Sequence, residues 1–440
     1  MWTAAASHAQ DADYSLYKEL EPQRKIVGPL VGHVTDTTAS IWAYAGPQTT
    51  PVVLEVAELG TSGDSPESDG APLRNSLLAT PDAEHHHVLK FEVAGLKPET
   101  EYVIGVRLVD DPQVVEPGIF TTAPPKGAGS KFRMAVSSCF GGQYVREEGR
   151  TKEVRGYRND SWKLLMDRRP DLQLIIGDIV YADSTDYNHM WDSHTLERVN
   201  NSPFGDAIRQ VPTYAVWDDH DYGPNDSDGT AEGKEQSLRA FHEVYANPPR
   251  PGGGGAGIYT RFEWGGVDFF LLDGRYHRTP NVAPDDEKKR ILGDEQFDWL
   301  VEQLKSSEAP FKLLVCGSTW AAARKVDSWE SFDYERRRLW EAIVKHKISG
   351  VVFVSGDIHR CDLPLHWPEV EGGYPMPEIT SSGLGSHGEH DALGFVYVDF
   401  DTTAADPTMT AHVVDGEDRE PLIRQVRASE LQVLEVKDEH

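Results

Sequence analysis

The chain has 440 residues, with 43 basic and 72 acidic side chains and a formal net charge of −29. A field of that sign opposes stable binding to nucleic acid, and it would repel a phosphate substrate unless bound cations reversed the charge locally. The length predicts two or three domains, three cysteines are too few for a disulfide framework, and no apolar run approaches the ~20 residues of a membrane span. Nothing in the sequence indicates an oligomeric state.

Residues 1–26 are polar and without periodicity, and we expect a tail there. Ser7-His8-Ala9 weakly matches the small residues that precede a signal-cleavage site, but the basic and apolar regions of a complete signal peptide are absent. The segment is therefore either the remainder of an export signal or a simple tail.

Residues 27–124 are predicted to be all-β, because apolar runs of strand length occur at 38–44, 52–56 and 88–93. Residues 61–81 are rich in Gly, Ser and Asp and predict a long surface loop. The pattern T-x-A-x-I-W, L-K-P-E-T-x-Y, F-T-T-A-P-P resembles fibronectin type III domains, so we expect a fibronectin III/Ig-like sandwich of about 100 residues.

After a Pro- and Gly-rich linker, residues 131–425 alternate between strands and helices, which predicts an α/β domain with a layered β-sheet core and flanking helices. The predicted strands are 133–136, 172–176, 213–216, 258–263, 267–272, 312–315, 351–354, 376–380, 395–400 and 408–414. The predicted helices are 160–169, 236–245, 294–305 and 335–345, and residues 426–440 are expected to form a C-terminal tail.

Five apolar runs end in residues that bind metals or move protons. They end at Ser138-Cys139, Gly177–Tyr181, Trp217–Asp221, Gly317–Trp320 and Gly356–His359. The ends of several strands can converge on one crevice at the edge of an open sheet. We therefore expect these side chains to form one site.

The individual segments allow two interpretations each. Asp178 could bridge two cations with Tyr181 as a phenolate ligand of Fe³⁺, or it could be a capping residue beside a packed tyrosine. Asp357 and His359 lie on the same side of an extended segment, as ligands would, but could be a cap and a surface histidine. Cys139 could be a thiolate ligand, although a lone cysteine at a strand end is more often a buried thiol.

The run from Asp218 to Asp221 is more specific, because three carboxylates around one imidazole repel one another unless a cation lies among them. His220 could remain outside the metal shell and act as a general acid. Arg275 and Arg278, after another strand, offer donors that match phosphate oxygens, or could pair with the abundant surface acids.

Taken in order, Gly-Asp-x-x-Tyr, Asp-His-Asp and Gly-Asp-x-His resemble the calcineurin-like metallophosphoesterase superfamily. This sequence departs from the usual pattern: it has Cys139 for an Asp, Asp219 for an Asn and Asp357 for a His, and Ser318 or Thr319 stands where a His is expected. Those departures, with Trp-Asp-Asp-His and Leu-Asp-x-Arg, are similar to the PhoD-like alkaline phosphatase D family, which also carries an N-terminal sandwich.

The resemblance implies a role for each matching residue. Cys139, Asp178, Tyr181 and His359 would hold Fe³⁺, and Asp178 would bridge to a Ca²⁺ held with Asp219 and Asp357. His220 would protonate or orient the leaving oxygen, Arg275 would grip a phosphoryl oxygen, and Asp221 and Asn225 would help to hold a further Ca²⁺.

The implied function is hydrolysis of phosphate esters by a metal-activated hydroxide, on a small-molecule or polymeric substrate, in the periplasm or outside the cell. The alternative is a dedicated phosphodiesterase or phospholipase D-like enzyme acting on polymeric or lipid diesters. A non-enzymatic anion-binding module is disfavoured, because the ligand sets are intact. Residues 383–391 are either a mobile flap or, as we favour, an ordinary loop.

Overall fold

The computed structural model describes residues 26–434, except for 47–49, 60–72, 84–85, 112–116, 157–159, 252–255, 322–325, 369 and 386–392. The predicted N-terminal tail, apart from Ile26, therefore lies outside the described residues, and so does most of segment 383–391. None of the helices in the described part of the chain is long and apolar enough to cross a membrane.

The N-terminal region is a pair of antiparallel sheets, as expected from its strand pattern. One sheet has the order β1-β2-β5, from β1 (Val27–Val34), β2 (Thr38–Tyr44) and β5 (Val88–Ala94). The other has the order β4-β3-β6-β7, from β3 (Val52–Glu58), β4 (Leu73–Ala79), β6 (Glu101–Leu108) and β7 (Pro117–Thr121). Apolar side chains of both sheets, such as Trp42 and Tyr102, are buried.

The predicted long loop at 61–81 is wrong at its end, because β4 occupies residues 73–79. This strand is at the edge of its sheet and pairs only with β3. Edge strands tolerate polar residues, since one side of the strand faces solvent. Pairing with β3, which the composition of these residues does not reveal, therefore accounts for the extended conformation of β4.

The second domain contains two mixed sheets. The first has the order β12-β11-β8-β20-β21-β22, from β8 (Lys131–Ser137), β11 (Leu172–Ile176), β12 (Thr213–Val216), β20 (Gly394–Asp401), β21 (Thr408–Asp415) and β22 (Leu422–Arg427). The second has the order β13-β14-β15-β16-β19-β17, with β18 paired to β19, from β13 (Thr260–Trp264), β14 (Val267–Leu271), β15 (Phe311–Val315), β16 (Val351–Ser355), β17 (Cys361–Asp362), β18 (Leu365–His366) and β19 (Met376–Ser381).

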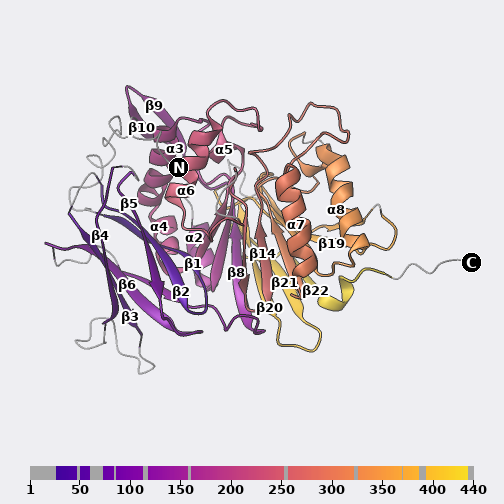
Figure 1. The fold of residues 1–440 in the computed structure, drawn as a ribbon, viewed down its shortest axis with the longest axis horizontal. Helices are drawn as coiled ribbons and strands as arrows, with labels where there is room; N and C mark the ends of the chain where they lie inside the picture. The colour runs from indigo at the N-terminus through magenta and orange to yellow at the C-terminus, as the bar shows by residue number, and fades with distance from the viewer. Residues whose placement is uncertain are drawn as a thin grey trace, which may run out of the picture.

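Helices cover the sheets on both sides. Figure 1 shows α3 (Tyr187–Asn200), α4 (Ser202–Gln210) and α6 (Lys234–Val244) toward the N-terminal sandwich, and α7 (Asp294–Ser306) and α8 (Asp333–Lys345) on the far side. Every residue of β11, β12, β14, β15 and β16, five of the parallel strands, is buried, as expected for strands covered on both faces. The layered α/β prediction is therefore confirmed.

Several elements of this domain were not predicted. One is the pair of helices α3 and α4, and another is the hairpin of β9 (Gln143–Glu147) and β10 (Arg150–Arg155). Others are the short strands β17 and β18, and β22. The last residues of β22 and a 3₁₀ turn at Ala428–Glu430 lie in the stretch expected to be a tail. In α3 the residues from His189 to Arg198 are all buried, although most of them are polar, so the sequence lacks the alternation of apolar and polar faces that would predict a helix.

The N-terminal sandwich is not a loosely attached module. Trp42 is fully buried, and its indole Nε1 donates to the backbone oxygen of Glu243, in α6, over 2.8 Å. The hydroxyl of Tyr214, in β12, accepts from the backbone N–H of Val34 at 3.2 Å. Buried apolar residues of both parts belong to one continuous core.

Candidate metal centre

The predicted site residues follow strands of both sheets at their carboxyl ends. Cys139 follows β8, Asp178 follows β11 and Asp219 follows β12, all in the first sheet. Asp357 and His359 follow β16 of the second sheet. Because these strands run parallel within each sheet, their side chains meet at one edge of the molecule.

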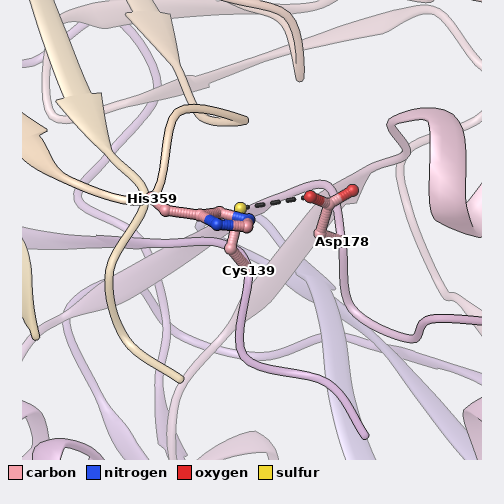
Figure 2. A group of neighbouring side chains, drawn as sticks. All are labelled: Cys139, Asp178 and His359. Carbon is pink, nitrogen blue, oxygen red and sulfur yellow. Dashed lines mark hydrogen bonds between the residues drawn. The ribbon is translucent and has the colours of Figure 1, made fainter. Parts of the chain in front are cut away.

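Cys139, Asp178 and His359 converge from three strand ends (Figure 2), and their ligand atoms all lie within 4.8 Å of one another. The Cys139 Sγ lies 3.2 Å from Asp178 Oδ2. The hydroxyl of Tyr181 completes the group, at 3.4 Å from the same carboxylate oxygen and 3.3 Å from His359 Nε2. A thiol, a phenol, an imidazole and a carboxylate thus surround one point.

A second group of acidic residues adjoins the first. Ligand atoms of Asp178, Asp219 and His220 lie within 4.8 Å of one another, and so do those of Asp218, Asp219 and Asp357. Asp178 therefore belongs to both groups, as a bridging carboxylate would.

Two buried carboxylate oxygens show that this donor set fits metal ions. Asp178 Oδ1 and Asp218 Oδ2 are buried and accept no hydrogen bond. A buried carboxylate without a partner is unfavourable, whereas a bound cation would satisfy both oxygens. The donors include the thiol and imidazole that transition metals accept and the carboxylates that Ca²⁺ prefers.

The ionised forms of the carboxyl, thiol and phenol groups in this centre depend on a nearby positive charge. Burial, and next the charge of Asp219, raise the pKa of Asp178 well above its ordinary value. Burial and the charge of Asp178 likewise raise the pKa of the Cys139 thiol, and burial raises the pKa of the Tyr181 phenol. A cation among them would reverse these shifts and deprotonate the ligands.

Four of the predicted ligands have left-handed backbone conformations. The φ angles are +55° at Cys139, +51° at Asp178, +74° at Asp357 and +52° at His359. Such residues are rare outside glycine and cost about 1–3 kcal/mol each, and they cluster at functional sites. Backbone bonds hold them here: Cys139 N donates to Gly177 O at 3.3 Å, and His359 N donates to the Ser382 hydroxyl at 2.8 Å.

His220 lies at the rim of the centre. Its Nδ1 is 2.6 Å from Asp183 Oδ1, and its ring centroid is 4.3 Å from that of Tyr181. Burial alone would lower the pKa of His220, but the bond to Asp183 and the charges of Asp178 and Asp219 outweigh it and raise the pKa to about 10. The acidic neighbours thus favour the protonated form of the imidazole. The sequence reasoning did not single out Asp183.

Arg275 lies in a different environment from the one expected of a phosphate-gripping residue. The side chain is fully buried, with Nε 2.6 Å from Asp218 Oδ1 and Nη2 2.7 Å from Asp327 Oδ2. Burial of Asp219 would raise the pKa of its carboxyl, but the charges of Arg275 and His220 outweigh burial and lower that pKa. Arg275 therefore pairs with acidic residues, but these are buried carboxylates and not the surface acids that the sequence suggested as the alternative.

Asp221 belongs to none of the ligand groups of the described residues. Asp221 Oδ1 accepts the backbone N–H groups of Ile179 and Val180 at 2.8 and 3.1 Å, so it holds the loop that carries Asp178. Asn225 is exposed. Instead, Asp226 and Asp327 form a third group with Asp219, and no strand end in the sequence marks either of them.

A two-sheet α/β core with metal-ligand side chains at the carboxyl ends of its parallel strands defines the metallophosphoesterase class. A sequence model of the PhoD-like phosphatase family matches residues 134–432, which is more than half of the chain. The chain therefore belongs to the PhoD-like phosphatase family.

Two named phosphatases are similar to parts of this chain at low sequence identity. Alkaline phosphatase D of Bacillus subtilis (strain 168) is 28% identical over 186 residues, which cover 35% of this chain and 32% of that protein. Purple acid phosphatase 23 of Arabidopsis thaliana is 23% identical over 302 residues, covering 62% of this chain and 56% of its own. The matched regions thus span about a third and about half of these relatives.

Two solved structures share the fold. The structure of PhoD has a TM-score of 0.72 at 18% identity, and the match covers 94% of this chain and 92% of that one. Purple acid phosphatase PPD1 from yellow lupin (Lupinus luteus) seeds has a TM-score of 0.61 at 14% identity, covering 91% and 74% of the two chains.

Proposed function

We propose that this protein is a metal-dependent phosphoric ester hydrolase of the alkaline phosphatase D type. The observation that carries the proposal is Asp178: it belongs to two adjoining ligand groups, and its Oδ1 is buried without a hydrogen-bond donor. Adjacent cations that share a carboxylate can act together on one phosphoryl group.

The donor types support iron and calcium as the two metals. Cys139, Tyr181 and His359 supply sulfur, phenol and imidazole around Asp178, a set suited to Fe³⁺. Asp219 and Asp357 supply only carboxylate oxygens, which suit Ca²⁺. When bound, the cations would polarise a phosphoryl oxygen and lower the pKa of a water molecule.

The remaining steps belong to side chains of the protein. His220 donates its proton to the departing oxygen of the ester, and Asp183 holds its imidazole in position through Nδ1. Arg275 keeps Asp218 in place and supports the ionised form of Asp219. The resident cations also offset the repulsion between a phosphate ester and a chain of net charge −29.

The N-terminal domain and the location complete the proposal. The division of seven strands into sheets β1-β2-β5 and β4-β3-β6-β7 supports a fibronectin type III-like sandwich. The resemblance to alkaline phosphatase D supports an exported protein.

The test is hydrolysis of p-nitrophenyl phosphate and of bis-p-nitrophenyl phosphate by purified protein, before and after treatment with a chelator. We expect turnover of at least one ester, lost on chelation and restored by added iron and calcium. The ratio of the two rates would distinguish a phosphatase from a dedicated phosphodiesterase. Turnover that persists in fully demetallated protein would refute the proposal.

A further inference from the structure

Ser382 lies beside the proposed iron ligands, at a point where the two sheets of the second domain meet. It follows β19 of the second sheet, whereas Cys139 follows β8 of the first. Both side chains are buried, and the Ser382 hydroxyl is 3.0 Å from Cys139 Sγ. A hydrogen bond to the sulfur therefore crosses from one sheet to the other.

The neighbours of Ser382 determine the direction of this hydrogen bond. The Ser382 oxygen accepts the backbone N–H of His359 at 2.8 Å. The Cys139 thiol donates its single proton to Asp178 Oδ2 at 3.2 Å, so between serine and cysteine the serine is the donor. A chain of bonds thus runs from the His359 backbone through the hydroxyl and the sulfur to the carboxylate, and each bond polarises the next.

A second hydroxyl, that of Ser138, lies near the same sulfur but points its proton elsewhere. It is 3.3 Å from Cys139 Sγ, and it donates to the backbone oxygen of Ser381 at 2.9 Å. A hydroxyl has one proton to donate, so that of Ser138 is not available to the sulfur. Among the described residues, Ser382 therefore carries the hydroxyl whose proton Cys139 accepts.

The residue before Ser382 holds the segment in place. The Ser381 hydroxyl donates to the backbone oxygen of Val136, in β8, at 2.6 Å and accepts the N–H of Val396, in β20, at 3.0 Å. These bonds join the end of β19 to two strands of the first sheet. They set the position of Ser382 independently of its contact with the sulfur, as expected of a residue that orients a metal ligand from outside the metal shell.

We propose that Ser382 is a positioning residue of the iron site, whose hydroxyl donates to the thiolate of Cys139 and reduces the negative charge that the sulfur presents to Fe³⁺. The inference rests on the proposed role of Cys139 as an iron ligand. A thiolate has no proton to give to Asp178, so the bond from Ser382 remains and becomes charge-assisted, which strengthens it. Hydrogen bonds to a ligating sulfur tune the electronic properties of the metal.

The test is the visible absorption spectrum and the reduction potential of the iron-loaded full chain. In Ser382→Ala the band that arises from the thiolate should move to longer wavelength and the potential should fall, because the sulfur then donates more charge to the iron. Retention of iron during dialysis should weaken about tenfold. A purely structural role of Ser382 would weaken retention without moving the band. Cys139→Ser identifies the band, since it removes the thiolate.

Two matched variants separate the hydrogen bond from a general disturbance of the site. Ser382→Thr keeps the hydroxyl and should have the band of the parent protein. Ser138→Ala removes the other hydroxyl near the sulfur, whose proton goes to Ser381, and should leave the band where it is. Thermal unfolding of each variant would verify that it remains folded.

The inference is overturned if Ser382→Ala keeps the band position and potential of the parent, or if Ser382→Thr or Ser138→Ala moves the band as far as Ser382→Ala does. Phosphoesterase activity of the same samples distinguishes this failure from that of the proposed function. An active parent whose spectrum Cys139→Ser does not change would overturn the inference and leave the hydrolase in place. An inactive parent whose band moves in Ser382→Ala would support the inference and contradict the proposed activity.

Discussion

At the residue scale, Cys139 distinguishes this centre from one built only of carboxylate and imidazole groups. Its thiol is buried, 3.2 Å from Asp178 Oδ2 and 3.0 Å from the hydroxyl of Ser382. Without a cation, burial and the Asp178 charge keep the thiol protonated. The site therefore needs the metal in order to use this ligand.

We predict that Cys139→Ser reduces phosphoesterase activity at least ~10-fold, because a serine hydroxyl ionises far less readily than a metal-bound thiol. It should also diminish the visible absorbance expected of thiolate-bound Fe³⁺, measured on the purified protein. Cys361→Ser is the matched control, since this thiol belongs to none of the ligand groups of the described residues. Equal absorbance and activity in Cys139→Ser and its parent would remove Cys139 from the metal shell.

His220 offers a second prediction at this scale. Asp183→Asn removes the carboxylate that holds Nδ1 at 2.6 Å, so proton donation to the leaving group should become slower. We expect a decrease of about 10- to 100-fold in kcat with a smaller change in KM, measured by steady-state kinetics. An ester with a very acidic leaving group should be affected least, and an equal loss for all esters would argue against the proton-donor role.

The sequence was sufficient to predict that Cys139, Asp178, Asp219 and His359 lie close together, because the carboxyl ends of parallel strands share one edge of a sheet. It was insufficient to predict the environment of Arg275, because the position of this residue after a strand does not reveal that its guanidinium donates to Asp218 and Asp327. Left-handed backbone conformations at four ligands were equally invisible, because tertiary contacts rather than local propensity impose them.

At the element scale, α3 supports the metal centre without supplying a ligand. The fully buried Glu197 accepts the backbone N–H of Gly142 at 2.9 Å and the hydroxyl of Tyr144 at 2.6 Å. Gly142 in turn accepts the N–H of Tyr181 at 2.9 Å. The helix therefore anchors the two loops that carry Cys139 and Tyr181.

We predict that Glu197→Ala lowers the free energy of unfolding by about 1–3 kcal/mol, because it leaves buried donors unsatisfied. It should also weaken retention of the metals, measured as metal content after dialysis. Tyr144→Phe removes one of these bonds and should cost about 1 kcal/mol. Normal stability and metal content in Glu197→Ala would show that the two loops keep their conformation without Glu197.

Glu335, in the first turn of α8, makes stability depend on pH. Burial raises its pKa from 4.5 to about 7, against the opposing effect of bonds from the Ile291 and Leu292 N–H groups. The protonated form favours the folded state, so this stabilisation is complete below about pH 4.5 and is lost as the pH rises through about 7.

Glu335→Gln should remove that contribution, of about 3 kcal/mol, and flatten the dependence of unfolding free energy on pH between 4.5 and 7.5. Urea unfolding at a series of pH values measures it. Glu341→Gln, exposed on the same helix, should keep the slope of the parent protein. Parallel curves for all three proteins would contradict the raised pKa of Glu335.

At the scale of the whole molecule, the linker at 124–130 lies between two domains that pack against each other. Trp42 of the sandwich is fully buried against the second domain, and the guanidinium carbon of Arg198, in α3, lies 4.3 Å from its ring centroid. Composition revealed the boundary between the domains, but contacts between residues distant in sequence determine the interface, and one sequence carries no direct signal for those.

We predict that Trp42→Ala destabilises the whole chain by about 3–5 kcal/mol and lowers the midpoint of a single unfolding transition. Calorimetry of the demetallated protein would measure it, with the exposed Leu78→Ala in the same sandwich as a near-neutral control. Two independent transitions, of which only the first responds to Trp42→Ala, would show that the domains unfold separately.

The central claim is that one carboxylate links two metal ions at the carboxyl ends of these strands. Elemental analysis of active protein, purified without chelator, tests it most directly. We predict about two or more metal ions per chain, iron and calcium among them, and loss of metal from both groups in Asp178→Asn. Active protein without bound metal, or an Asp178→Asn variant with the metal content of its parent, would contradict this account.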